Sequence, residues 1–595
     1  MFVCCLSAHT SFAQQSDEQL AAYYFSNGQF DQAAELYETL YRNNSNTYYY
    51  QMLFRSYLEL NQFREAERLA EKRLKKTPND LTLYVDLGTV YSRSGNQKKA
   101  GKQYDKALES IGVDSRQVSN LAMAFDAIGM SDYVVNTYLT ARQKAKNRFL
   151  YVSEVATAYA RVGKWEAMIQ EYFDLLDNSP ASMNSVQVSL QRNLREASDD
   201  QLADGLRRSL IMRVQQSPNN KVYLEMMIWF SLQQKDFQFA YTQAKAVAAR
   251  FPDMGAEQLY RVANIATSNE DFVVAQKCYE SLVAFGNESP YYFDSRTGLL
   301  QAKFAQLNRN YPVAKGSLQT LISEYEAVFE ELGRNEKTVP ILRDYASLMA
   351  YHANRPQEAV DALYDILEMP RVNGKTKSEV KLDLGDLMLF AGEVWDASLL
   401  YMQVEKAFKN DVIGAQAKLK NAQLSYYHGD FLWAKSQLDV RRASTSKLVA
   451  NDAMRLSLLI SDNMEDDSTF EMLSLYAAAD LLLYQNKLDS AWDAYSAISQ
   501  RVLSHPLLDE VMFQKAQIRM RQERFVEADS LLQQLVDFYP EDILADDALM
   551  LLAQLNEEKL NNKERARSCY EKLLLDYPVS LFVDQARQRY NAIKQ

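Results

Sequence analysis

The stretch LAAYYFSNGQFDQAAELYETL, residues 20–40, decides the fold because its pattern returns four times along the chain. The returns are LFRSYLELNQFREAERLAEKR from residue 53, LGTVYSRSGNQKKAGKQYDKA from 87, LAMAFDAIGMSDYVVNTYLTA from 121 and VATAYARVGKWEAMIQEYFDL from 155. The steps are 33, 34, 34 and 34 residues. A constant period of this length predicts an array of helix–turn–helix units.

Each unit repeats the same core positions. A large apolar residue opens the first helix, and an aromatic residue follows on the same face one turn later. The openers are Leu20, Leu53, Leu87, Leu121 and Val155, and the aromatics are Tyr24, Tyr57, Tyr91, Phe125 and Tyr159.

The turn and the second helix are equally regular. The turn position holds Gly28, Gly95, Gly129 and Gly163, with Asn61 in the second unit. Both residue types tolerate positive φ, so they end a helix at low cost. Five positions later stands a small or slender residue that lets the two helices approach closely: Ala33, Ala66, Ala100, Val134 and Met168.

This pattern resembles the tetratricopeptide repeat (TPR). The resemblance implies an all-α fold, a TPR-type α-solenoid in which stacked helix–turn–helix repeats form a right-handed superhelix. Looser copies extend it to about fourteen units. Their small-residue positions are Ala240, Ala275, Ala314, Ala359, Ala397, Ala434, Ala491, Ala528 and Ala566.

Breaks in the register suggest the domain limits. Residues 181–220 keep a helical pattern without the small residue, and LVANDAMRLSLLI, residues 448–460, reads as a lone amphipathic helix. Since a solenoid unit contacts only its neighbours, such breaks are natural boundaries. We expect a signal-peptide remnant at 1–13, an N-terminal TPR array at 14–180, a central degenerate array at 181–444 and a C-terminal array at 445–595.

Composition and motifs argue against several functions. The net charge of −12 disfavours nucleic-acid binding, which needs surplus Lys and Arg. No apolar run of about 18 residues is present to span a membrane. We find no P-loop, dinucleotide, zinc-protease or EF-hand motif, and the histidines stand alone. We therefore expect no enzyme activity, no cofactor and no metal, and the two cysteines of the repeats, Cys278 and Cys569, to be free and buried.

In a TPR superhelix, first-helix residues that face away from the second helix line an inner groove. We expect this groove to bind protein partners. The arginines among its residues would suit a carboxylate-bearing partner; alternatively, they are scattered surface charges that contribute little. In the first array the candidate residues are Gln51, Arg55, Leu58, Arg93, Arg116, Met123, Thr157 and Arg161.

The two ends of the chain suggest where it works. Residues 530–593, with a recurring Tyr-Pro after the second helix, resemble TPR proteins of Gram-negative envelopes, which hold other envelope proteins and do no chemistry. Ser11–Phe12–Ala13 before Gln14 fits a signal-peptidase site. A basic start is missing, so we expect the true start to lie upstream. These features predict a periplasmic scaffold, associated with the outer membrane and bound to envelope proteins.

Other readings stay open. Without a secretion signal, the chain would be a cytoplasmic TPR adaptor. A further alternative is that the chain is a non-catalytic subunit whose acidic loop, Glu465–Asp467, completes the active site of a partner enzyme. Cys4, Cys5 and His9 lack the spacing and the fourth ligand of a zinc site.

Overall fold

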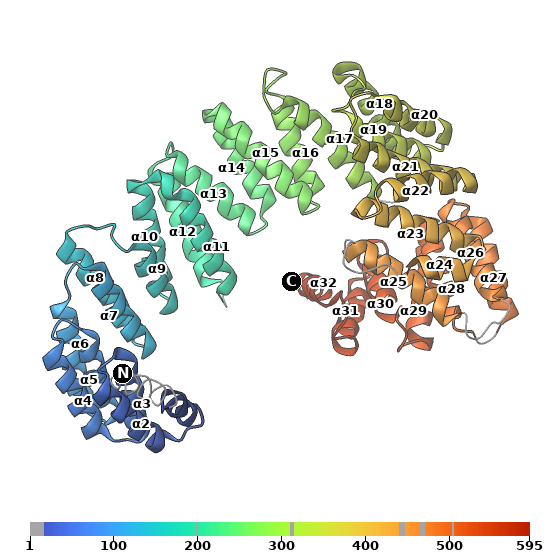
Figure 1. Cartoon of the computed structure of the whole chain (residues 1–595). Coiled ribbons are helices and arrows are strands. Elements are labelled where there is room, and N and C mark those ends of the chain that lie inside the picture. Colours follow the sequence, from blue (N-terminus) through green and yellow to red (C-terminus); the bar gives the residue numbers. More distant parts are fainter. Residues whose placement is uncertain are drawn as a thin grey trace, which may run out of the picture. The chain divides into compact units, whose positions relative to one another are not determined.

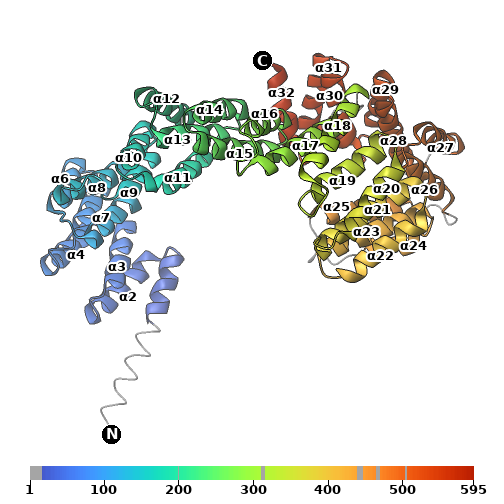
Figure 2. The same ribbon diagram turned by 90° about the horizontal axis from the view of Figure 1, so that it is seen from above.

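The computed structural model describes residues 17–197, 200–309, 315–438, 447–463, 470–502 and 505–594. Within these ranges the chain is helical and contains no strand, which confirms the all-α solenoid (Figures 1 and 2). Several expectations fall outside them: the Cys4, Cys5 and His9 motif, residues 11–13, Ala314 and the Glu465–Asp467 loop. The chain divides into two compact units, Met1–Gln243 and Ala244–Gln595. The predicted limits near 181 and 445 remain predictions.

The first unit is a row of helix pairs, beginning with residues 17–26 and α2 (Phe30–Asn43). The following pairs are α3 (Thr47–Glu59) with α4 (Phe63–Lys76), α5 (Thr82–Arg93) with α6 (Gln97–Ser110), α7 (Ser115–Ala127) with α8 (Ser131–Ala145), α9 (Val152–Arg161) with α10 (Trp165–Asn178), and, after the short η1 (Pro180–Ser182), α11 (Met183–Glu196) with α12 (Gln201–Gln216). After α13 (Lys221–Gln233), the division between the units falls inside α14 (Phe237–Arg250).

The second unit continues the helical pairing. Its pairs are α15 (Pro252–Ser268) with α16 (Phe272–Val283), α17 (Tyr292–Arg309) with α18 (Lys315–Leu332), α19 (Val339–Ser347) and the π-helical η2 (Leu348–His352) with α20 (Pro356–Glu368), α21 (Gly374–Ala391) with α22 (Val394–Ala407), α23 (Val412–Tyr427) with α24 (Phe431–Leu438), α26 (Glu471–Tyr484) with α27 (Leu488–Arg501), α28 (Leu508–Arg521) with α29 (Phe525–Phe538), and α30 (Ala545–Glu558) with α31 (Lys563–Asp576). The lone helix expected near residue 450 is α25 (Lys447–Asp462), and α32 (Val583–Lys594) comes last.

The turns have the predicted backbone. The residues at the five equivalent positions have φ between 56° and 85°, in the left-handed region: Gly28, Asn61, Gly95, Gly129 and Gly163. Helix starts are fixed by side-chain caps such as Asn46, which accepts from the amide of Tyr48 at 2.6 Å, and Asp114, which accepts from the amide of Gln117 at 2.8 Å. Local chemistry therefore marks the starts of α3 and α7.

The small-residue positions lie in the core. Ala33, Ala66, Ala100, Val134 and Met168 are all buried, as predicted. In α11 and α12, where the small residue is missing, a core of Val186, Leu190, Leu202, Leu206 and Leu210 replaces it.

One core prediction is wrong. Leu53, Leu87, Leu121 and Val155 are buried, but Leu20 is 42% exposed and Ala21 beside it is fully buried. Leu53, at the equivalent position, packs with Tyr37 and Leu40 of the preceding helix pair, and the described residues include no such pair before residues 17–26.

The two cysteines of the repeats are free and buried, as predicted. Burial raises the pKa of the Cys278 thiol to about 12, and burial also raises the pKa of Cys569. Both thiols therefore pack as small apolar side chains.

Candidate protein-binding groove

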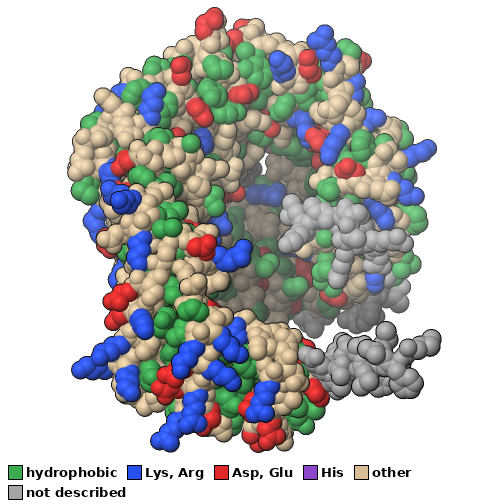
Figure 3. All heavy atoms as spheres, turned by 60° about the vertical axis from the view of Figure 1, so that its left-hand side comes forward, with side chains coloured by type: hydrophobic (Ala, Val, Ile, Leu, Met, Phe, Trp, Pro, Cys, Tyr) green, Lys and Arg blue, Asp and Glu red, His purple; other side chains and the backbone are tan. Residues whose placement is uncertain are grey.

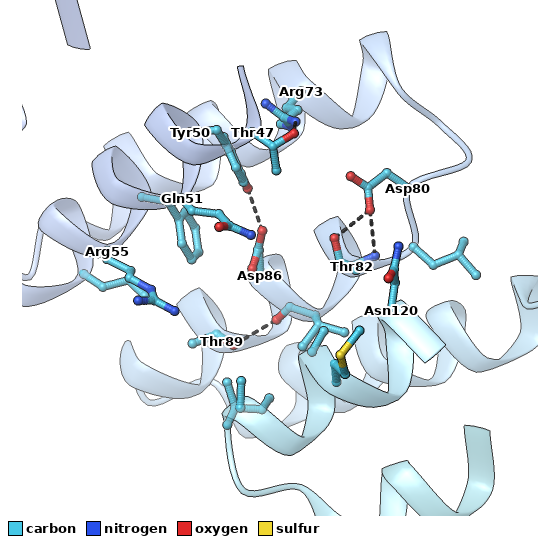
Figure 4. Close-up of a pocket in the computed structure, with 18 of the residues that line it drawn as sticks. Thr47, Tyr50, Gln51, Arg55, Arg73, Asp80, Thr82, Asp86, Thr89 and Asn120 are labelled. Atoms are coloured by element: carbon cyan, nitrogen blue, oxygen red, sulfur yellow. Dashed lines mark hydrogen bonds between the residues drawn. The ribbon is translucent and has the colours of Figure 1, made fainter. Parts of the chain in front are cut away.

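A groove of about 1200 Å³ opens in the first unit. First-helix side chains of three successive pairs line it, from α3, α5 and α7, together with the connection before α5 (Figure 4). Part of these faces is exposed among the described residues, at Gln51, Arg55, Arg116, Asn120 and Met123. A space of this size accommodates a peptide segment.

Six of the eight predicted residues line this groove: Gln51, Arg55, Leu58, Arg93, Arg116 and Met123. Gln51, Arg55 and Arg116 are exposed, and Met123 is 61% exposed. Leu58 borders the groove but is buried among α3, α4 and α5, so it serves packing first.

The two predicted residues on α9 lie outside the groove. The Thr157 hydroxyl donates to the Ser153 carbonyl at 2.7 Å, and Arg161 pairs with Asp126 of α7. The sequence pattern assigned the side chains of Thr157 and Arg161 to a ligand, but in the structure they interact with groups of this chain.

The sequence pattern missed two first-helix residues that line the groove, Asp86 and Asn120. Each directly precedes a buried leucine, Leu87 or Leu121. A polar residue at that one position of the unit is a signal that could have located the groove.

Asp86 is half-buried on α5 and accepts a hydrogen bond from the Tyr50 hydroxyl at 2.7 Å. Burial raises the pKa of Asp86 to about 7, and nearby Asp80 adds to the rise. The Tyr50 hydrogen bond and the positive charges of Arg73 and Arg55 act in the opposite direction. The carboxyl therefore changes charge near neutral pH.

Arg73 was missed because it belongs to a second helix, α4, which the repeat pattern assigns to packing. Its guanidinium donates to the Thr47 hydroxyl at 2.8 Å and lies 4.5 Å from the centre of the Tyr50 ring. The residue is 8% exposed, and its buried Nε has no hydrogen-bond partner among the described residues.

The other charged residues of the groove differ in whether they have a partner among the described residues. Arg93 pairs with Glu59 at 2.9 Å, and Asp80 accepts from the Thr82 hydroxyl at 2.6 Å. Asp114 serves as the N-cap of α7. Neither Arg55 nor Arg116 forms a salt bridge with a residue that the structure describes. Elsewhere on this unit, basic and acidic side chains are interspersed (Figure 3).

No described helix combines the length and the apolar character that a membrane span requires. Within the described residues, no group of three or more His, Cys, Asp or Glu side chains could hold a metal ion.

Comparison with known families identifies repeats at both ends of the chain. The family model described as "Psidin, N-terminal TPR repeats region" matches residues 56–180, which include most of the groove. The model described as "Tetratricopeptide repeat" matches residues 510–542 and 547–580, the pairs α28–α29 and α30–α31. We find no curated protein that matches the chain.

Solved structures give weak likenesses. The structure titled "Structure of Naa15/Naa10 bound to HypK-THB" has 14% identity and a TM-score of 0.29, over 98% of this chain and 96% of that one. A tetratricopeptide repeat protein from Parabacteroides merdae has 15% identity and a TM-score of 0.28, over 50% of this chain and 98% of that one. Yeast Tom70 has 13% identity and a TM-score of 0.27, over 97% and 99%.

Proposed function

This chain is a tetratricopeptide repeat protein, and we propose that it is a non-enzymatic scaffold that holds other proteins through the groove of its first unit. The observation that carries the proposal is the groove itself, a space of about 1200 Å³ lined by partly exposed first-helix faces of three pairs. A partner enters it as an extended segment or a helix.

The chemistry of the lining suits a peptide. Met123 offers an exposed apolar contact, and Gln51 and Asn120 offer amide groups that bond to a peptide backbone. Apolar area with a few polar groups is the usual composition of a protein interface. Because the helices that line the groove are already folded and stacked, the groove loses little conformational entropy when a partner binds.

Affinity capture from an extract of the native host, read by quantitative mass spectrometry, tests the proposal. Met123→Lys places a charge in the groove, and we expect it to release the captured partner. Val188→Lys is the matched control, because Val188 is 60% exposed on α11 and lies outside the groove. Equal recovery of every partner by parent, Met123→Lys and Val188→Lys would contradict the proposal.

We further propose that the scaffold works in the bacterial periplasm, next to the outer membrane, with envelope proteins as partners. The support is the signal-peptidase pattern at Ser11–Phe12–Ala13 and the resemblance of residues 530–593 to envelope TPR proteins. A native protein that begins at Gln14 in the periplasmic fraction would support this. Intact Met1 on a cytoplasmic protein would instead indicate a cytoplasmic adaptor.

A further inference from the structure

Four arginines and four carboxyl groups line the groove of the first unit, and one pair of them, Arg93 with Glu59, forms a salt bridge. Glu59, Asp80 and Asp114 each interact with neighbouring groups of the chain, as described above. Arg55 and Arg116 line the same groove without a carboxylate partner among the described residues. From these two exposed arginines, unpaired among the described residues, we infer that the groove selects an acidic segment of a partner protein, whose carboxylates pair with Arg55 and Arg116. The inference rests on the proposed function and names the chemistry of the partner.

Arg73 gives an independent reason. It lines the groove, yet it is 8% exposed, and its buried Nε lacks a hydrogen-bond partner in the part of the chain that the structure describes. A buried, unsatisfied N–H group is costly. An arriving carboxylate satisfies this donor, and charge-assisted bonds of this kind are the strong ones. The stacking of Arg73 on the Tyr50 ring fixes the guanidinium in place beforehand.

Asp80, Asp86 and Asp114 line the groove and would oppose an acidic ligand, and Asp86 is the one of them whose pKa is raised toward neutral pH. The groups around it are Tyr50 and Arg55 on α3, Arg73 on α4 and Asp80 before α5. Burial raises the pKa of Asp86 to about 7, so its carboxyl is partly protonated at neutral pH and repels an incoming carboxylate only weakly. Below pH 7 the repulsion disappears, while the glutamates of a ligand stay ionised. Binding of an acidic segment should therefore tighten as the pH falls from 8 to 6.

A nucleic acid is the competing polyanion. The net charge of −12 opposes a long phosphate backbone, because the rest of the protein surface repels it. A short acidic peptide avoids that surface by lying within the groove. We therefore assign the groove to a protein segment.

The test uses the full chain and three fluorescein-labelled peptides of equal length, in which Glu, Gln or Lys alternates with Leu and Ala. Fluorescence anisotropy at moderate salt measures their affinities. We expect the Glu peptide to bind about tenfold more tightly than the Gln peptide. The advantage should shrink as salt rises. An equally tight Gln or Lys peptide, or an equally tight single-stranded oligonucleotide of the same charge, would overturn the inference.

Substitutions of the groove arginines test whether the preference for the Glu peptide arises in the groove. Arg55→Glu with Arg116→Glu should weaken the Glu peptide about tenfold or more. The matched control, Arg64→Glu with Arg195→Glu, changes the net charge equally at exposed positions outside the groove. Asp86→Asn should remove the dependence on pH and give the tight binding at pH 8. Equal losses in the two double variants would overturn the inference.

The capture experiment separates the two proposals. If Met123→Lys releases a partner but no acidic preference appears, the scaffold function stands and the acidic inference fails. If neither variant nor peptide has an effect, both fail.

Discussion

Tyr104 packs so closely against Gly88 that a Cβ atom on Gly88 would lie 2.0 Å from the ring carbon Cε1. Gly88 belongs to α5 and Tyr104 to α6, so the two residues form the contact between the helices of one repeat. The same contact recurs in the second unit, where a Cβ on Gly385 would lie 2.4 Å from Cε1 of Tyr401. A first-helix glycine thus makes room for a second-helix aromatic ring.

Gly88→Ala should destabilise the protein, because the added methyl cannot fit without moving the Tyr104 ring or the helix. We expect a loss of about 1–3 kcal/mol from overpacking. Gly101→Ala is the matched control, since nothing lies within 4 Å of a Cβ at that position of α6. It should stabilise by about 0.5–1 kcal/mol through helix propensity. Urea unfolding of both variants checks this, and equal stabilities would contradict the packing account.

Glu523 has a φ of 61° in the turn between α28 and α29, where other repeats carry glycine. Glu523→Gly should stabilise by up to about 1 kcal/mol, because it removes the strain of a left-handed residue but makes the unfolded chain more flexible. The reverse change, Gly129→Ala, should destabilise by a similar amount; its φ is 73° and no atom lies within 4 Å of the new Cβ. Thermal unfolding that shifts both variants in the same direction would contradict this assignment of the turns.

Glu510 predicts a dependence of stability on pH. Burial raises its pKa well above the ordinary 4.5, and the adjacent Asp509 carboxylate adds to the rise. The folded protein therefore keeps a proton at pH values where the unfolded chain has lost it, so stability falls as the pH rises above 4.5. Glu510→Gln should raise the melting temperature at pH 8 and leave it nearly unchanged at pH 4.

The control for that prediction is Glu541→Gln, at an exposed position of the connection between α29 and α30. It should shift the melting temperature by little at either pH. A Glu510→Gln variant that loses stability at pH 8 would show that the carboxylate is ionised and paired in the folded protein.

Cys278 and Cys569 should resist thiol reagents in the folded protein. Both are buried and have raised pKa values, and the reactive species is the thiolate. In a variant with Cys4 and Cys5 changed to Ser, we expect little reaction with Ellman's reagent at pH 8, and reaction of both thiols in guanidinium chloride. Rapid reaction of a thiol in the native protein would contradict the burial.

The repeat architecture could be predicted because its causes are local. A residue that tolerates positive φ at Gly28 or Gly95, and a small residue five positions later, require only the near neighbours that the sequence shows. Leu20 shows the limit of that reasoning. Its pattern is that of the other units, but its burial depends on a neighbouring repeat.

The groove was predicted in part for the same reason. First-helix positions such as Gln51 and Met123 follow from the repeat register. Arg73 and Asp86 do not, because one lies on a second helix and the other acquires its properties from burial against Tyr50. Pairings across repeats, such as Arg161 with Asp126, depend on side-chain reach that periodicity does not encode.

Site-specific photo-crosslinking in the native host tests the central claim most directly. A benzoylphenylalanine at Gln51 lies in the groove, whereas one at Lys98 lies on the exposed face of α6 outside it. If the groove holds a partner, light should join position 51, but not position 98, to a discrete protein. Capture of the same protein from position 98, with no adduct from position 51, would contradict the account.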